Sequence, residues 1–414
     1  MSEESKKILK SLSDELEKGE LDDVGRRRLI SQARKLVSSL KNEGDVIMDV
    51  FFAVSWIPLD PQDNVTLMVI PCFPFQPLQG NVIKVMMDLG LFKALVSGGH
   101  PQTAAQLAEQ SNKNIDPQLL NRLLRFLAAH GYVDQVEDKY QGNSATRALA
   151  RDESEYGAEH SVGFLYDGYN KIPEHLKRIG YVNPADKKYS PLSLAKNMDG
   201  KDTFEILAVD PALEATNKWF RAVSAQYTPW IQTYPFLERV PMVNDGEVQF
   251  VDVGGNLGHQ TLILKEANPQ LPGRFIVQDL TNIVPATSHL APAGVEFQPY
   301  NFYDEQPVKG AACYYMRYIV HDWGNADGIR ILTRVREAMK PGYSKLLINE
   351  WVVPEQGASR MVTGADMVMM VAGSGMERTL AQFRELIEKA GLKIGEVFYA
   401  KDEISPAIIE VVVA

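Results

Sequence analysis

The stretch from residue 248 to the C-terminus constrains the fold most, because short apolar segments alternate there with helical ones. The apolar segments are rich in β-branched and aromatic residues and fall at 248–255, 273–280, 295–302, 311–320, 344–353, 391–400 and 407–414. Continuous apolar strands separated by helices are typical of a parallel sheet covered on both faces. The sequence therefore predicts an α/β domain with a mostly parallel sheet, and the two closing strands suggest an antiparallel edge.

A helical region with a different outline precedes this domain. Helical patterns at 81–99, 103–110 and 116–131 are followed by two short strands around a polar turn at 132–143. We expect one helix with an internal glycine over 81–99, and Asp116 followed by Pro117 to begin the helix at 116–131. Three helices and a hairpin are the outline of a winged-helix unit.

The charge of the chain argues against nucleic acid as a partner. Its 414 residues carry a formal net charge of −10, whereas binding to phosphates or to anionic lipid requires a surplus of Lys and Arg on some face. A structural or dimerisation role is therefore favoured for the winged-helix unit. The two cysteines, Cys72 and Cys313, cannot build a disulfide framework. With a charged N-terminus and no long apolar run, the sequence predicts a cytoplasmic protein without a membrane partner.

Four parts are expected along the chain. Residues 1–45 form two amphipathic helices, 46–150 the winged-helix-like domain, 151–235 an aromatic-rich helical connection, and 236–414 the α/β domain. The connection either lines an apolar pocket or is plain packing. His160 lies in it, and a lone histidine there is usually structural, although it is also a candidate for the pocket wall.

The first strand of the α/β domain leads into a glycine-rich turn. Gly254, Gly255 and Gly258 follow it in the motif VDVGGNLGHQ and permit close approach of a ligand at the start of the next helix. The next strand ends in Asp279, an acidic residue at the spacing that suits a ribose diol. The loop does not match the pattern for a pyrophosphate, so a nucleoside ligand without a diphosphate fits better.

A set of motifs in register then identifies a family. VDVGGNLGH, QDL, YNFYDEQP, MRYIVHDW, LINEWVVPE and ERTLAQFRELIEKAGLKI together resemble the S-adenosylmethionine-dependent O-methyltransferases of the plant caffeate type, and especially their fungal relatives. The resemblance implies an N-terminal winged-helix dimerisation domain, a C-terminal Rossmann-like methyltransferase domain with a seven-stranded sheet, S-adenosylmethionine as cofactor, and a homodimer. It implies no metal site.

The resemblance also assigns cofactor-binding roles. The three glycines would lie against the methionine end of the cofactor, and Asp279 would accept hydrogen bonds from the ribose hydroxyls. Asn301 and Phe302 occupy the adenine-binding position. Asparagine departs there from the aspartate of the family, and it keeps an acceptor oxygen but loses the charge. Arg317 stands where the family has a basic residue near the cofactor.

His321 matches the general base of the family. It would take the proton of an acceptor hydroxyl, and Glu350 and Glu377 match the acidic pair that flanks it. Independently of the resemblance, His321 follows one predicted strand and Glu350 ends the next, so both should reach the same edge of the sheet. By itself, Asp322 is best interpreted as a helix cap.

A group of methionines provides pocket candidates. Met367, Met369, Met370 and Met376 lie just before Glu377, and in the family methionines near this position line the acceptor pocket. A methionine stripe is also common in a plain core.

Three functions are compatible with these residues. The leading one is O-methylation of a phenol or enol of a small aromatic or polyketide-like metabolite. The alternative is a pericyclase, because some fungal relatives keep the cofactor but close a ring instead of transferring a methyl group. Such an enzyme does not need the base and its carboxylates, all of which are present here. A non-catalytic binding protein is the third possibility. In such a protein we would expect the base and its flanking carboxylates to have been lost.

Overall fold

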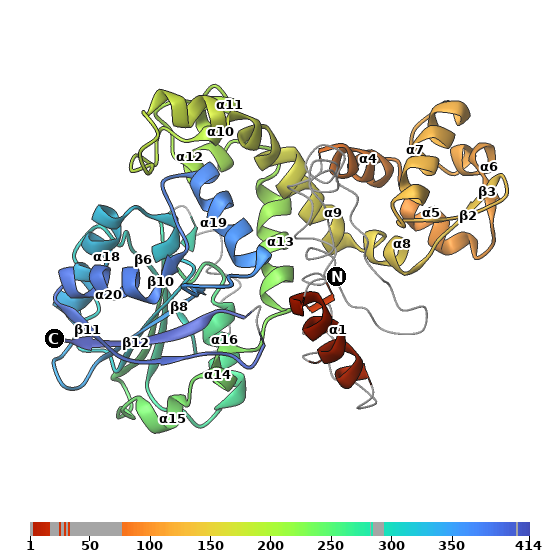
Figure 1. The fold of residues 1–414 in the computed structure, drawn as a ribbon. Helices are drawn as coiled ribbons and strands as arrows, with labels where there is room; N and C mark the ends of the chain where they lie inside the picture. Colours follow the sequence, from red (N-terminus) through yellow and green to blue (C-terminus); the bar gives the residue numbers. More distant parts are fainter. Residues whose placement is uncertain are drawn as a thin grey trace. The chain divides into compact units, whose positions relative to one another are not determined.

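The computed structural model describes residues 3–16, 25, 29, 32, 33, 77–281, 283, 284, 294–402 and 405–414. The chain divides into two compact units, Met1–Glu155 and Tyr156–Ala414 (Figure 1). The finer boundaries expected after residues 45, 150 and 235 stay predictions. Of the two predicted N-terminal helices, α1 (Glu3–Leu16) is present. The second, within 25–44, falls mainly outside the described residues, as does Cys72.

The first unit contains the predicted succession of helices and a hairpin. Its elements are α4 (Pro77–Asp88), α5 (Leu91–Gly98), β1 (Gln102–Thr103), α6 (Ala104–Glu109), α7 (Pro117–Ala129), β2 (Asp134–Val136), β3 (Lys139–Gln141) and α8 (Ser144–Leu149). β2 and β3 pair antiparallel and β1 joins the outer side of β3. The core between the helices is apolar, with Leu107, Leu120, Leu124 and Leu127 fully buried.

Two local expectations in this unit have different outcomes. Asp116 caps α7, since its side chain accepts from the backbone N–H groups of Gln118 at 2.6 Å and Leu119 at 3.0 Å, with Pro117 in the first turn. The single helix expected over 81–99 is wrong. Gly90 has φ of 69° and separates α4 from α5, because a left-handed residue ends an α-helix and glycine adopts that conformation without a steric penalty.

The second unit is built on a seven-stranded sheet with the order β11-β12-β8-β7-β4-β5-β6. Its strands are β4 (Val248–Val253), β5 (Arg274–Asp279), β6 (Glu296–Pro299), β7 (Cys313–Arg317), β8 (Lys345–Glu350), β11 (Leu392–Phe398) and β12 (Ala407–Val413). Neighbours from β8 to β6 pair in parallel, while β12 is antiparallel to β8 and to β11. The predicted parallel sheet with an antiparallel edge is confirmed.

Helices cover both faces of this sheet. α18 (Asn325–Ala338) and α20 (Leu380–Lys389) pack on one face, and α14 (Trp230–Thr233), α15 (Phe236–Arg239) and α16 (His259–Ala267) on the other. β4 shows why both faces are apolar, because its side chains alternate between the two clusters: Val251 and Val253 belong to one, and Phe250 to the other. Among the described residues, no helix is both long and apolar enough to cross a bilayer.

The connection between residue 151 and the sheet is helical. It contains α9 (Asp152–Ala158), the π-helix η2 (Glu159–Leu165), α10 (Tyr166–Arg178), α11 (Pro191–Ala195), α12 (Thr203–Leu207) and α13 (Leu213–Ser224). Phe164, Leu192 and Leu207 form an apolar cluster with Val371 of α19 (Arg360–Ala372). A side chain at Gly168 would collide with Val371, so glycine at this position lets α10 approach α19 closely.

The packing around β4 gives a stability prediction. Phe250 is fully buried and its ring lies 5.8 Å from that of Trp230 and 5.4 Å from that of Tyr315. We expect Phe250→Ala to lower the free energy of unfolding by about 3–5 kcal/mol, because it leaves a cavity in the core. Val209 is 71% exposed, so Val209→Ala is the control and should change stability by less than about 0.5 kcal/mol. Equal effects in denaturant titrations of the two variants would contradict this packing.

Candidate active site

His321 and Glu350 meet at the carboxyl edge of the sheet. β7 and β8 are parallel neighbours with Arg317 opposite Asn349. Glu350 is the last residue of β8, and His321 lies in a short 3₁₀ turn, Val320–Asp322, just after β7. Both therefore reach the same edge, as the order of strands in the sequence predicts.

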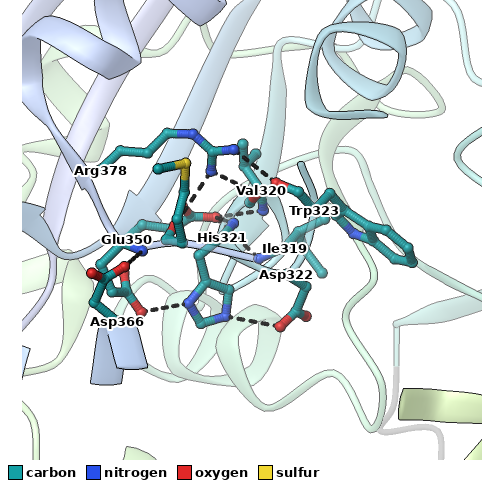
Figure 2. Close-up of polar contacts among 10 residues, drawn as sticks. Ile319, Val320, His321, Asp322, Trp323, Glu350, Asp366 and Arg378 are labelled. Carbon is teal, nitrogen blue, oxygen red and sulfur yellow. Dashed lines mark hydrogen bonds and ion pairs between the residues drawn. The ribbon is translucent and has the colours of Figure 1, made fainter. Parts of the chain in front are cut away.

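Glu350 holds the main chain of this turn. Its Oε1 accepts from the backbone N–H groups of Ile319 at 3.1 Å, Val320 at 2.6 Å and His321 at 3.2 Å (Figure 2). The carboxyl is fully buried, and burial raises its pKa. The two acids expected to flank the histidine therefore make different contacts. Glu350 accepts from the backbone of the histidine turn, and Glu377 contacts the imidazole ring.

Arg378 secures the same turn from the other side. It is fully buried, and its guanidinium donates to the carbonyl oxygens of Val320 at 2.9 Å and Trp323 at 2.7 Å and to Oδ1 of Asn325 at 3.0 Å. This residue was not among the predicted site residues. Its position directly after Glu377 was a signal, but an arginine in a motif looks like a surface residue until its burial is known.

The imidazole of His321 lies between two carboxylates. Its Nδ1 is 2.8 Å from Oε1 of Glu377, and its Nε2 is 3.5 Å from Oδ1 of Asp322 (Figure 2). Burial by itself lowers the pKa of His321, but Glu377 and Asp322 outweigh it and raise the pKa to about 10. Burial raises the pKa of Asp322 to about 6, with His321 opposing that shift.

The expectation that Asp322 caps a helix is wrong. The residue that precedes α18 is Gly324, and no side chain caps that helix. Asp322 belongs to the turn of His321 and faces its ring. The ring of Tyr318 stacks on the imidazole with centroids 5.2 Å apart. Tyr318 has φ of 52°, a conformation that a bulky residue adopts only where its surroundings impose it.

The glycine-rich turn lies beside the histidine turn. Gly254 and Gly258 have φ of 72° and 74°, which glycine adopts without strain. A Cβ at Gly254 would overlap the side chain of Ile319, and one at Gly255 would overlap Asp252 and Val277. The backbone of the glycine turn therefore packs directly against Ile319, Asp252 and Val277, with no room for a side chain at Gly254 or Gly255.

Asp279 is placed next to this turn at the end of β5. Its Oδ2 accepts from the backbone N–H of Asn256 at 2.8 Å and its Oδ1 from its neighbour Leu280 at 2.7 Å. Burial raises the pKa of Asp279. Each carboxylate oxygen keeps a further lone pair for a ligand hydroxyl, as a ribose diol requires.

Arg317, at the end of β7, has N–H groups without a hydrogen-bond partner in the described part of the chain. Its Nη1 donates to Oε1 of Gln260 at 2.9 Å, and its guanidinium lies over the rings of Tyr227 and Tyr318. Within the part of the chain that the structure describes, its Nε and Nη2 are buried without a hydrogen-bond partner. Buried donors in proteins are normally paired, so these two fit a polar ligand such as the amino-acid end of a cofactor.

Asn301 and Phe302, the candidates for the adenine site, contact mainly residues of their own loop and Trp323. Asn301 is exposed and its side chain accepts from the backbone N–H of Tyr303 at 3.1 Å, so part of its acceptor capacity serves its own turn. Phe302 packs edge-on against Tyr303 and Trp323. Both lie just beyond the end of β6, at the carboxyl edge of the sheet.

The pocket candidates come from different elements, with His160 in η2, Met367 and Met370 in α19, and Met376 in the segment after α19. His160 is tied to Thr216 of α13, with Nδ1 3.1 Å from the hydroxyl, and burial lowers its pKa to about 4, so it is neutral. Met376 contacts the site through its backbone N–H, which donates to the carbonyl of His321 at 2.8 Å. Met367 is 43% exposed on α19 and Met370 is partly buried.

A pocket borders Asp322 and Trp323, the two residues that follow His321. Its wall includes Asp322, Trp323, Lys187, Phe204, Thr203 and Met369. The ammonium of Lys187 lies 3.9 Å from the centre of the Trp323 ring. Lys187 and Phe204 come from the connection, and the sequence offered no signal that links them to the HDW motif.

Comparison with known proteins identifies both units. A family model described as the O-methyltransferase domain matches residues 215–393, and one described as the O-methyltransferase dimerisation domain matches residues 78–152. Methyltransferase cfoC of Aspergillus candidus is 32% identical over 90% of this chain and 87% of its own length. Demethylsterigmatocystin 6-O-methyltransferase of Aspergillus flavus is 30% identical over 92% of each chain.

Solved structures agree with these relatives. The complex of LepI with S-adenosylmethionine has a TM-score of 0.82 at 29% identity and covers 99% of both chains. OxaC in complex with sinefungin and meleagrin has a TM-score of 0.81 at 26% identity, also over 99% of both chains. A structure described as a pericyclic reaction enzyme has a TM-score of 0.81 at 29% identity over the full length of both.

The hold on the histidine turn can be tested by stability. We expect Glu350→Ala to lower the free energy of unfolding by about 3–5 kcal/mol, because three backbone N–H groups, two of them in buried hydrogen bonds, lose their acceptor. Glu355→Ala, the same exchange at an exposed position five residues on, is the control and should lie within about 0.5 kcal/mol of the parent protein. Similar denaturation midpoints for the two variants would show that Glu350 does not carry the turn.

Proposed function

The chain belongs to the family of S-adenosylmethionine-dependent O-methyltransferases, together with enzymes of fungal secondary metabolism, and on that premise we propose that it methylates a phenolic or enolic hydroxyl of a small secondary metabolite. The observation that carries the proposal is the contact of Ile319 with Gly254. It brings the turn of His321 directly against the glycine turn, which supports one site for the proposed base and the proposed cofactor loop.

The cofactor residues follow from this arrangement. We propose that Gly254, Gly255 and Gly258 lie against the methionine end of S-adenosylmethionine, with the free donors of Arg317 beside it. The carboxylate of Asp279 receives the ribose hydroxyls, and Asn301 and Phe302 border the adenine. When bound, the cofactor supplies an electrophilic methyl group on a positively charged sulfur.

His321 is the proposed general base, with Nε2 as the atom that takes the proton. An ordinary histidine has a pKa near 6.5 and is a weak base for a phenol with a pKa of about 10. Glu377 and Asp322 raise the pKa of His321, which brings the basicity of the unprotonated imidazole closer to that of a phenolate and so favours proton transfer to it. Glu377 on Nδ1 orients the ring and stabilises the imidazolium that forms.

The acceptor is proposed to be aromatic or polyketide-like, with His160, Met367, Met370 and Met376 as candidates for its pocket. One relative is named a demethylsterigmatocystin 6-O-methyltransferase, and at 30% identity it supports only the class of acceptor for this chain. The apolar and aromatic side chains beside Asp322 support the same class.

A pericyclase is the second candidate, because a structure described as a pericyclic reaction enzyme covers the whole chain at 29% identity. Ring closure at unchanged mass needs an oriented substrate but no proton acceptor. The complete set of His321, Glu350 and Glu377 therefore supports methyl transfer as the leading proposal.

We also propose that the enzyme is a homodimer assembled through its dimerisation domain, which spans residues 78–152. The division into parts at 1–45, 46–150, 151–235 and 236–414, and a cytoplasmic location, remain proposals from the sequence. Light scattering at micromolar concentration should give twice the mass of the chain, and a monomer would contradict the assembly.

The activity is tested with the purified protein, S-adenosylmethionine and a panel of phenols and enols, followed by mass spectrometry. At least one acceptor should gain the mass of a methyl group. His321→Ala should lower that rate by about 10²-fold or more, since general bases contribute about 10²–10⁴, while cofactor affinity is retained. A panel that gains no mass, together with a reactive precursor that isomerises, would favour the pericyclase.

The cofactor site is tested separately by calorimetry with S-adenosylmethionine. We expect Asp279→Asn to weaken binding about 10- to 100-fold, because hydrogen bonds to a charged acceptor contribute about 1.5–3 kcal/mol. Asp304→Asn is the matched control, since Asp304 is exposed just beyond β6. Unchanged affinity of Asp279→Asn would exclude the carboxylate from the ribose site.

A further inference from the structure

The imidazole of His321 makes a single hydrogen bond to the residues that the structure describes. Its Nδ1 lies 2.8 Å from Oε1 of Glu377. Asp322 does not provide a second one, because its Oδ1 lies 3.5 Å from Nε2, beyond the usual length of such a bond. A histidine side chain turns about two bonds, and one hydrogen bond, which tolerates a range of angles, does not fix both. A further contact is needed to hold Nε2 in one direction.

Tyr318 makes that contact through its ring. The phenol ring and the imidazole are stacked, with centroids 5.2 Å apart and an angle of 27° between their planes, which is within the range of stacked aromatic pairs. In the described part of the chain, the buried hydroxyl of Tyr318 has no hydrogen-bond partner. The ring, and not the hydroxyl, is therefore what contacts the histidine.

The backbone of Tyr318 keeps this contact against its local preference. Its φ of 52° lies in the left-handed region, which glycine and asparagine enter most easily. A bulky residue there is an outlier that its surroundings must hold, and such outliers concentrate at active sites. The N–H of Tyr318 donates to the carbonyl of Asn349 at 3.3 Å, and the next N–H donates to Glu350. The strained backbone thus brings the ring to the face of the imidazole.

Three further groups surround the ring of Tyr318. The ring centroid of Trp351 lies 5.4 Å from it and that of Tyr227 lies 6.4 Å from it, and the guanidinium of Arg317 is 5.2 Å away. These groups come from separate parts of the chain, because Arg317 ends β7, Trp351 follows β8, and Tyr227 lies between α13 and α14. The ring of Tyr318 is therefore held independently of His321, and it offers the imidazole a fixed surface.

We propose that Tyr318 is a positioning residue that, together with Glu377, holds the imidazole of His321 in the orientation in which Nε2 receives the proton of the acceptor. Glu377 fixes the edge of the imidazole at Nδ1, and Tyr318 closes one of its faces. Tyr318 exchanges no proton and acts only through His321. This inference deepens the proposed function and rests on it.

A Tyr318 that only fills space predicts a different behaviour. Its replacement would then lower stability, while the imidazole stayed ordered and each folded molecule kept its rate. Three substitutions separate the two roles. Tyr318→Phe keeps the ring and Tyr318→Leu removes it. Tyr318→Asn also removes the ring, but it suits the positive φ and so relieves the backbone.

The order of the imidazole is measured by ¹³C NMR relaxation of the full chain labelled at its 7 histidines, with His321→Gln to assign the signal. The order parameter of the C–H bond at Cδ2 should be about 0.85 in the parent protein and in Tyr318→Phe, and should fall below about 0.6 in Tyr318→Leu and Tyr318→Asn. Tyr399→Leu, the same exchange at a position that is 60% exposed, is the control and should leave it unchanged.

A mobile imidazole in the parent protein overturns the proposal, and so does an ordered one in the variants that lack the ring. If Tyr318→Leu does not fold, Tyr318→Asn carries the comparison. This readout needs no acceptor, so it is separate from the test of the proposed function.

Kinetics at saturating S-adenosylmethionine, with any acceptor that the panel yields, provide the second readout. Tyr318→Leu and Tyr318→Asn should lower kcat by about 10-fold or more, because a misplaced catalytic group loses its effective concentration, whereas Tyr318→Phe should keep most of the rate. A full rate in the variants without a ring contradicts the role of Tyr318. If no acceptor is methylated, the proposed function fails, and the order parameter still decides whether Tyr318 holds the imidazole.

Discussion

One buried carboxylate organises the site. Oε1 of Glu350 accepts hydrogen bonds from the backbone N–H groups of three successive residues just after β7, and in a low-dielectric interior such bonds are strong. They fold the chain into the turn that presents His321. Arg378 donates to the carbonyl oxygens of Val320 and Trp323. The turn therefore has partners for backbone N–H groups and for backbone carbonyl groups. The backbone that carries the imidazole is therefore held by both side chains.

The site also depends on strand order. Because β7 lies between β4 and β8, the glycine turn after β4 and the acid at the end of β8 flank the histidine turn. The residues proposed to bind the nucleoside and those proposed to transfer the proton therefore meet at one edge, as is usual for open α/β sheets. The connection supplies Lys187 and Phe204 to the pocket beside Asp322.

Much of this could be predicted from the sequence. The strands and their mostly parallel arrangement follow from the apolar pattern. The placement of His321 and Glu350 at the same edge follows from the rule that parallel strands end at one edge of the sheet. The helix break at Gly90 could not be predicted, because a glycine between two apolar runs looks the same whether it continues a helix or ends one. Asp322 and Arg378 were misassigned or missed for a related reason. Burial decides what a charged residue does, and burial comes from tertiary packing that no local pattern contains.

The hold of Glu350 on the turn is made entirely through main-chain atoms, and this has an evolutionary consequence. The three hydrogen bonds of Glu350 do not involve the side chain at position 321, so a substitution there leaves them in place. Such a fold can exchange the chemistry at its centre while it retains the architecture around it. Relatives described as a methyltransferase and as a pericyclic reaction enzyme both match this chain over at least 90% of its length, as such an arrangement favours.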